Sequence, residues 1–198
     1  MAITYDVLAE RLAPGPAAPA ARLARQAALV AGGVALLALA AKVQVPMWPV
    51  PITMGTFAVL TLGAAYGPAL GLTTILAYMA LGALGLNVFA GSGAEASGVA
   101  YMMSGTGGYL LGYVLAVAAL GLLARRGWDR SAGSMAGALL IGNALIYVPG
   151  LLWLGALFGW DQPILAWGLW PFLIGDALKL GLAAMLLPAA WRLLGREG

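Results

Sequence analysis

Long apolar stretches, interrupted by short segments rich in proline, glycine or charge, set the pattern of this chain. A membrane-spanning helix needs roughly 20 predominantly apolar residues. Prolines at 46, 49 and 51 separate the first two stretches after Arg25, because proline cannot continue a helical hydrogen-bond ladder. The pattern predicts an all-α integral membrane bundle of six transmembrane helices, at residues 26–43, 52–65, 68–86, 107–124, 135–158 and 164–191.

Two short segments flank this predicted bundle, which occupies residues 26–191 and forms the candidate substrate-binding domain. Residues 1–25 contain three prolines and several arginines, and they predict a flexible or interfacial amino-terminal arm with a short helix over residues 5–12. Residues 192–198 form a carboxy-terminal tail.

The composition agrees with a membrane protein and narrows its chemistry. Hydrophobic residues make up 63% of the chain and charged residues 9%, against about 45–50% and about 25% in soluble domains. The chain has no histidine and no cysteine, which removes thiolate nucleophiles, serine–histidine catalysis and the usual zinc or haem ligands. We therefore expect no enzyme activity, no cofactor and no metal site. The basic residues form no single patch, so nucleic acid is not an expected partner.

The distribution of arginines predicts how the chain is oriented in the lipid bilayer. With the amino terminus in the cytoplasm, eight of the ten basic residues fall on the cytoplasmic side, as the positive-inside rule requires. An even number of spans then places both termini in the cytoplasm of a multi-pass plasma-membrane protein. The eight residues are Arg11, Arg22, Arg25, Arg125, Arg126, Arg130, Arg192 and Arg196.

The first predicted span carries small residues at a spacing of four. Ala27, Ala31 and Ala35 share one helix face, and small faces let helix backbones approach closely in lipid. Periodicity alone favours packing within the bundle. The alternative is a docking face for another membrane subunit.

The most informative polar residues are Asp176 and Lys179 in the last predicted span. A charge near the middle of a membrane helix is costly unless it is paired or hydrated, and such residues usually mark functional sites. At positions i and i+3 the two side chains share a face and can neutralise each other. A purely structural ion pair is the alternative interpretation.

Other polar residues cluster near the predicted outer ends of the spans. The glycine-rich segment Ser104–Tyr109 opens a helix and predicts exposed backbone N–H groups that could bind an anion or a carbonyl, with Tyr109 adding a ring and a hydroxyl. Together with the ion pair, these residues predict a small-molecule pocket beneath a lid formed by residues 87–106. The further candidate contacts are Thr53, Asn87, Ser92 and Asn143.

No site for ATP hydrolysis is visible in the sequence. The chain has two lysines, Lys42 and Lys179, and neither follows the glycine of a phosphate-binding loop. Any ATP-driven step must therefore come from a partner protein.

Five motifs, in this order, resemble the BioY family, the biotin-binding S components of energy-coupling-factor (ECF) transporters. The resemblance extends from about residue 27 to residue 187. The motifs are Pro49-Val-Pro-Ile-Thr53, Tyr66-Gly-Pro-Ala-Leu-Gly71, Leu81-Gly-Ala-Leu-Gly-Leu-Asn-Val-Phe-Ala-Gly91, Gly105-Thr-Gly-Gly-Tyr-Leu-Leu-Gly112 and Gly175-Asp-Ala-Leu-Lys179.

The resemblance implies a six-helix bundle that captures biotin from outside the cell. It also implies assembly with a transmembrane coupling subunit and two ATP-binding-cassette (ABC) ATPases, and toppling in the membrane to release the substrate. By resemblance, Asp176 and Lys179 are the first candidate ligand contacts and Tyr109 is the next. The same resemblance turns the small face of the first span into the docking face for the coupling subunit.

Two positions depart from the family pattern, and one of them is Asn87, where many members have a proline. Gly55 stands where many members have a polar residue, commonly glutamine. Two alternatives to biotin capture remain: an S component for another vitamin, such as thiamine or riboflavin, and an intramembrane enzyme that uses Asp176.

Overall fold

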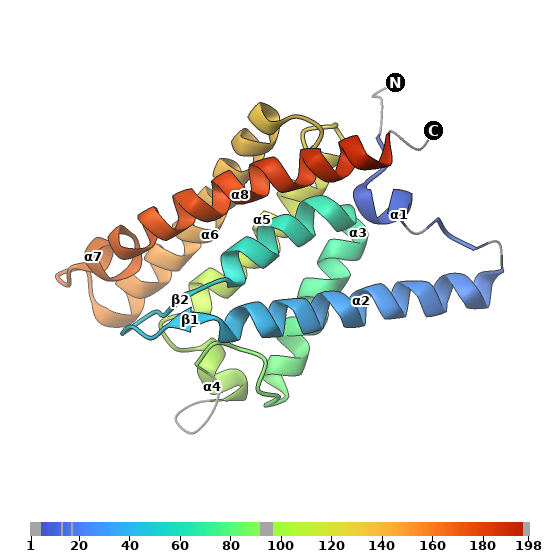
Figure 1. Ribbon diagram of the computed structural model, residues 1–198. Helices are drawn as coiled ribbons and strands as arrows, with labels where there is room; N and C mark the ends of the chain where they lie inside the picture. The colour runs from blue at the N-terminus through green and yellow to red at the C-terminus, as the bar shows by residue number, and fades with distance from the viewer. Residues whose placement is uncertain (1–4, 13, 17, 92–96, 196–198) are drawn as a thin grey trace.

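The computed structural model describes residues 5–12, 14–16, 18–91 and 97–195. Within these ranges the chain is a helical bundle with one small two-stranded ladder (Figure 1). The elements are α1 (Leu8–Leu12), α2 (Pro19–Lys42), β1 (Gln44–Val45), β2 (Ile52–Thr53), α3 (Gly55–Ala83), α4 (Gly98–Met102), α5 (Gly107–Ala124), α6 (Ala132–Phe158), α7 (Ile164–Gly168) and α8 (Trp170–Leu194).

Five helical stretches among the described residues are long and apolar enough to cross a membrane. They are α2, α3, α5, α6 and the stretch Ile164–Leu194 that contains α7 and α8. The predicted membrane bundle of helices is therefore confirmed. The predicted spans at 52–65 and 68–86 correspond to the two arms of α3, which is bent between them; residues 52–53 belong to β2, and α3 ends at Ala83.

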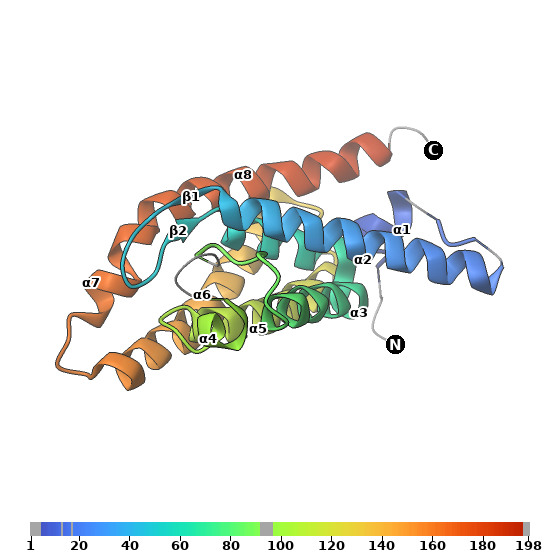
Figure 2. The ribbon, with the colours of Figure 1, turned by 90° about the horizontal axis from the view of Figure 1, so that it is seen from below.

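The bend in α3 lies at Gly67, whose backbone is not helical (φ 74°, ψ 179°). A positive φ favours glycine, which has no Cβ to clash. Pro68 follows; it lacks an N–H and disfavours a helical conformation in the residue before it. Figures 1 and 2 show the chain changing direction at this point, so that the two arms of α3 lie on different paths through the bundle.

Close packing of α3, α5 and α6 forms the core, and glycines permit the approach. An ideal Cβ at Gly63 would lie 3.0 Å from the Cα of Val117 in α5. At Gly112 of α5, a Cβ would lie 2.6 Å from the Cα of Ile146 in α6. Small residues at such crossings let backbones approach in lipid, where packing drives helix association.

The helix α2 runs along the edge of the bundle (Figures 1 and 2). It begins at Pro19, earlier than the predicted start at residue 26, because proline is well tolerated in the first turn of a helix. Only 17% of the most apolar 18-residue stretch of this helix is buried, and Ala27, Ala31 and Ala35 are all exposed. Periodicity alone favoured packing within the bundle. Among the described residues, this face instead packs against no other helix of the bundle.

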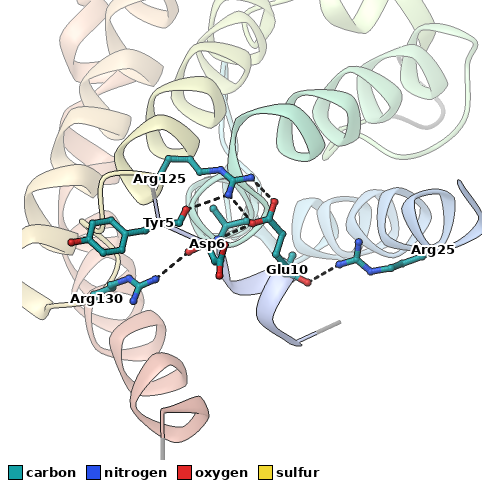
Figure 3. A network of polar contacts seen from close by, with 8 residues as sticks. Tyr5, Asp6, Glu10, Arg25, Arg125 and Arg130 are labelled. Atoms are coloured by element: carbon teal, nitrogen blue, oxygen red, sulfur yellow. Dashed lines mark hydrogen bonds and ion pairs between the residues drawn. The ribbon is translucent and has the colours of Figure 1, made fainter. Parts of the chain in front are cut away.

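Residues 5–12 pack against the end of the bundle where the bend lies. Val7 is fully buried, 3.0 Å from where a Cβ on Gly67 would lie. The Tyr5 N–H donates to the carbonyl of Arg125 at 2.9 Å, and the Arg125 guanidinium pairs with Glu10 (Figure 3). This hydrogen bond from Arg125 lowers the pKa of Glu10. The predicted short helix is α1, held by these contacts.

We expect Gly112→Ala to destabilise the bundle, because the added methyl group would press on the backbone of α6. Overpacking of this kind typically costs about 1–3 kcal/mol. Thermal unfolding in detergent should show a melting temperature several degrees below that of the wild type.

The matched control is Gly181→Ala in α8, where an added Cβ meets nothing within 4 Å. Alanine favours a helix over glycine by roughly 0.5–1 kcal/mol, so this variant should melt at the wild-type temperature or above. Equal melting temperatures for the two variants would contradict the packing argument.

Candidate functional site

A cavity lies between α2, α3, α5, α6 and α8, beside the β1–β2 ladder. The empty space in and around it, counting the open solvent at its mouth, is about 690 Å³. Lys179 is the one charged side chain among the described residues that line it, and the threonines Thr53, Thr56 and Thr106 contribute hydroxyl groups. The aromatic lining residues are Tyr78, Phe89, Tyr101, Tyr109, Tyr113, Tyr147 and Phe172.

Asp176 and Lys179 form a buried ion pair at the wall of this cavity. The Lys179 ammonium donates to Asp176 Oδ1 at 2.9 Å, and the two side chains are 11% and 5% exposed for lysine and aspartate respectively. Asp176 lies behind Lys179 and does not itself line the cavity. The aspartate therefore acts on the cavity through the lysine that it holds.

Polar groups from two other helices complete the pair. Lys179 also donates to the carbonyl oxygen of Thr53 at 2.7 Å and to Thr56 Oγ1 at 3.1 Å. The Tyr147 hydroxyl donates to Asp176 Oδ2, and Thr56 donates to Asp176 Oδ1 at 3.4 Å. All three ammonium protons thus have acceptors on the protein, as a buried charge in a membrane requires.

The proline-rich segment explains how Thr53 reaches the lysine. It keeps the chain extended before α3, and the short antiparallel ladder pairs Gln44 with Thr53. The Thr53 hydroxyl accepts a hydrogen bond from the Gly55 N–H at 2.9 Å, while its carbonyl faces Lys179. Extended backbone at membrane depth is tolerated where it lines a cavity, and here the lysine binds its carbonyl.

Gly55 leaves space for a tyrosine hydroxyl. An ideal Cβ there would lie 3.1 Å from the Tyr113 hydroxyl oxygen and 2.8 Å from Thr53 Oγ1. A larger residue would press on both, and the Thr53 hydroxyl would have to shift. Tyr113 therefore supplies a polar group in the part of the cavity where Gly55 supplies none.

Tyr109 contributes its ring to the cavity and its hydroxyl to the scaffold. The hydroxyl donates to the carbonyl of Gly168 at 2.8 Å, which ties α5 to α7. The ring packs over Gly150 and stands edge-on to Tyr147 at 6.2 Å between centroids. Gly107 and Gly108 pack closely against Trp153 of α6, and the Gly107 N–H, predicted to be exposed, donates to the carbonyl of Ser104 at 3.1 Å.

A short segment after α3 closes one side of the cavity. Phe89 is 1% exposed, stacks on Tyr101 at 5.0 Å and is edge-on to Tyr78 at 5.3 Å. Lys42 at the end of α2 donates to Asn87 Oδ1 and to the Phe89 carbonyl, both at 2.5 Å. Asn87 therefore fixes this segment to α2 and does not line the cavity.

Two further predicted residues lie away from the cavity lining. Asn143 is buried in α6, one turn before Tyr147, and its Oδ1 has no hydrogen-bond partner among the described residues. Ser92 lies outside the described residues.

Thr56 and Tyr113 line the cavity without having been singled out as binding residues. Tyr113 follows Tyr109 by four residues, so the two share one face of α5. That spacing was available in the sequence. Nothing in the sequence points to Thr56 in this way, because its contact with Lys179 depends on how α3 and α8 lie side by side.

These features define a class of protein: a helical membrane protein whose aromatic cavity, beside a buried ion pair, suits a small molecule. Among the described residues, no cluster of acidic side chains could hold a metal ion.

Comparison with known proteins agrees with this class. The family model for BioY matches residues 11–196. A protein of Pyrococcus horikoshii described as a probable biotin transporter is 36% identical over 163 residues, covering 82% of this chain and 94% of that protein. A biotin transporter of Thermotoga maritima is 31% identical over 156 residues, covering 77% and 87%.

A crystal structure at 2.1 Å of the S component for biotin from an ECF-type ABC transporter has the same fold. Its TM-score is 0.71 at 21% identity, covering 89% of this chain and 95% of that one. This chain belongs to the BioY family, which confirms the resemblance carried by the five motifs. It is a multi-pass protein of the plasma membrane, and its relatives are transporters.

We expect Lys179→Met to destabilise the protein, because it leaves the Asp176 carboxylate buried without its cation. Breaking a buried pair on one side typically costs about 3–5 kcal/mol, whereas replacing both partners is often neutral. The double variant Lys179→Met/Asp176→Leu should therefore recover much of the lost melting temperature in detergent. A double variant no more stable than the single one would contradict the pairing.

Proposed function

We propose that this chain captures biotin from the outer side of the plasma membrane and imports it as the S component of an ECF-type ABC transporter. The observation that carries the proposal is the aromatic cavity, in which Lys179 is the one cation among the described lining residues, in a chain of the BioY family.

The chemistry of the cavity suits biotin. Biotin has an apolar fused ring and alkyl chain, a ureido group and a carboxylate. The aromatic rings provide apolar contact for the fused ring and the alkyl chain, and the hydroxyl of Tyr113 can hydrogen-bond the ureido group. The biotin carboxylate pairs with Lys179 by taking the place of one of its present acceptors. Thr56 is the most distant of the three, at 3.1 Å.

The other candidate residues take supporting roles in this proposal. Asp176 and the Thr53 carbonyl hold the Lys179 ammonium group in position through their hydrogen bonds. The Tyr109 ring forms part of the cavity wall. Asn87 holds the closing segment through Lys42. Asn143 offers an acceptor one turn below Tyr147.

In this proposal the chain crosses the membrane six times, with both of its ends in the cytoplasm. Each arm of α3 counts as one crossing, so the bend at Gly67 lies near the cytoplasmic surface. Figures 1 and 2 place α1 and the end of α8 at the same end of the molecule. Arg125 and Arg130 lie there as well (Figure 3), as the positive-inside rule favours. The cavity then opens toward the outside.

Partner proteins supply the energy in this proposal. The exposed face of Ala27, Ala31 and Ala35 on α2 suits a closely packed helix of a transmembrane coupling subunit. Two ABC ATPases attached to that subunit hydrolyse ATP, for which this chain has no phosphate-binding loop.

Equilibrium binding of labelled biotin to the purified protein in detergent tests substrate capture. We expect binding at micromolar biotin or below, with thiamine and riboflavin failing to compete. Lys179→Ala and Asp176→Asn should each weaken biotin binding at least about tenfold, or 1.4 kcal/mol. Absence of binding by the wild type would overturn the proposal.

Biotin methyl ester separates a direct role of Lys179 from a loss of folding. The wild type should bind the uncharged ester at least about tenfold more weakly than biotin, because the ester cannot pair with the ammonium group. Lys179→Ala should bind the two compounds equally. If the variant still discriminates against the ester, Lys179 does not bind the carboxylate.

The proposed docking face predicts that Ala31→Trp abolishes co-purification with the coupling subunit while biotin binding stays unchanged. The indole would keep the partner helix from approaching the α2 backbone. Leu178→Trp, at a 73% exposed position on α8, is the matched control and should assemble normally. Assembly retained by Ala31→Trp would count against α2 as the docking face.

A further inference from the structure

A groove lies between α1 and the last turn of α8. These two elements lie at the end of the molecule opposite the β1–β2 ladder, which borders the candidate biotin cavity (Figure 1). Three arginines line it: Arg11 from α1, Arg130 from the connection between α5 and α6, and Arg192 from α8. Trp191 and Asp6 also line it. Three separate segments thus bring positive charge to one concave surface.

Arg130 is held in place on this surface. Its guanidinium carbon lies 4.2 Å from the Trp191 ring centroid and 4.7 Å from that of Tyr5. Its Nη2 donates to the carbonyl of Asp6 at 3.3 Å (Figure 3). A planar guanidinium fixed by stacking loses little further freedom on binding, and its remaining N–H groups match the oxygens of a phosphate.

The acidic side chains around the groove leave its positive charge largely uncancelled. Glu10 is paired with Arg125. Asp129 is 1% exposed, accepts from Trp191 Nε1 at 2.5 Å, and has its pKa raised by burial. Asp6 is the one carboxylate among the described residues that line the groove, against three arginines.

The level of the groove relative to the lipid bilayer indicates which anion it binds. Trp191 is half-buried in the last turn of the membrane-length helix α8, and tryptophan at a span end sits at the level of lipid headgroups. Basic pockets between helices at this level bind anionic headgroups. We propose that this groove binds the phosphate of an anionic phospholipid in the leaflet on the side of α1 and the last turn of α8.

Native mass spectrometry of the purified protein with phosphatidylglycerol or phosphatidylcholine tests this proposal. The wild type should retain phosphatidylglycerol in preference to phosphatidylcholine. The double variant Arg11→Gln/Arg192→Gln should lose about tenfold in that preference, since it removes two of the three charges and leaves Arg130 stacked. Arg126→Gln is the matched control: it removes an exposed arginine of the same end that does not line the groove, and its preference should equal that of the wild type.

Equal lipid preference in the wild type and the groove variant would overturn the proposal, and so would an equal loss in Arg126→Gln, which would indicate diffuse attraction. A separate arm adds inorganic phosphate at millimolar concentration to the lipid-bound protein. The lipid should stay bound, because its headgroup is anchored beside Trp191. Displacement by free phosphate would overturn the assignment of the groove to a lipid. Biotin binding, measured in parallel, should be unchanged in all variants.

Discussion

The buried pair of Asp176 and Lys179 is the constraint around which the rest of the bundle is arranged. Two opposite charges at membrane depth are tolerated when they neutralise each other and every remaining proton and lone pair finds a partner. One helix cannot meet that requirement. The partners come from the segment before α3, from α3 itself and from α6, through Thr53, Thr56 and Tyr147. Satisfying the pair therefore joins three parts of the chain around one point.

The cavity beside this point exists because large rings and glycines alternate across the helix contacts. Phe89 occupies the space left by Gly82, and Tyr109 occupies the space left by Gly150 and Gly168. The backbones approach at other glycines, Gly63 and Gly112, while the rings of Phe89 and Tyr109 line the cavity. The glycines and the rings thus provide the tight core and the apolar wall that a small ligand contacts.

The two ends of the molecule are built from different chemistry. One end holds the aromatic cavity and the segment that Lys42 fixes to α2. The other holds the amino-terminal residues, bound to the bundle by Arg125 and Arg130 and packed on the bend at Gly67. The edge helix α2 runs between these ends with its small face uncovered. A partner that binds α2 would therefore contact the helix whose last residue holds the cover of the cavity.

The sequence by itself determined the membrane class, the approximate spans and the importance of the ion pair, because long apolar runs and a charge within them have few physical solutions. Spacing also placed Ala27, Ala31 and Ala35 on one face, and Asp176 with Lys179 on another. Only the tertiary structure decided what each face meets. Periodicity fixes the side of a helix on which a residue lies but carries no information about the neighbour across from it. For that reason Asn87, predicted to contact the ligand, instead binds Lys42, while Thr56 and Tyr113 line the cavity.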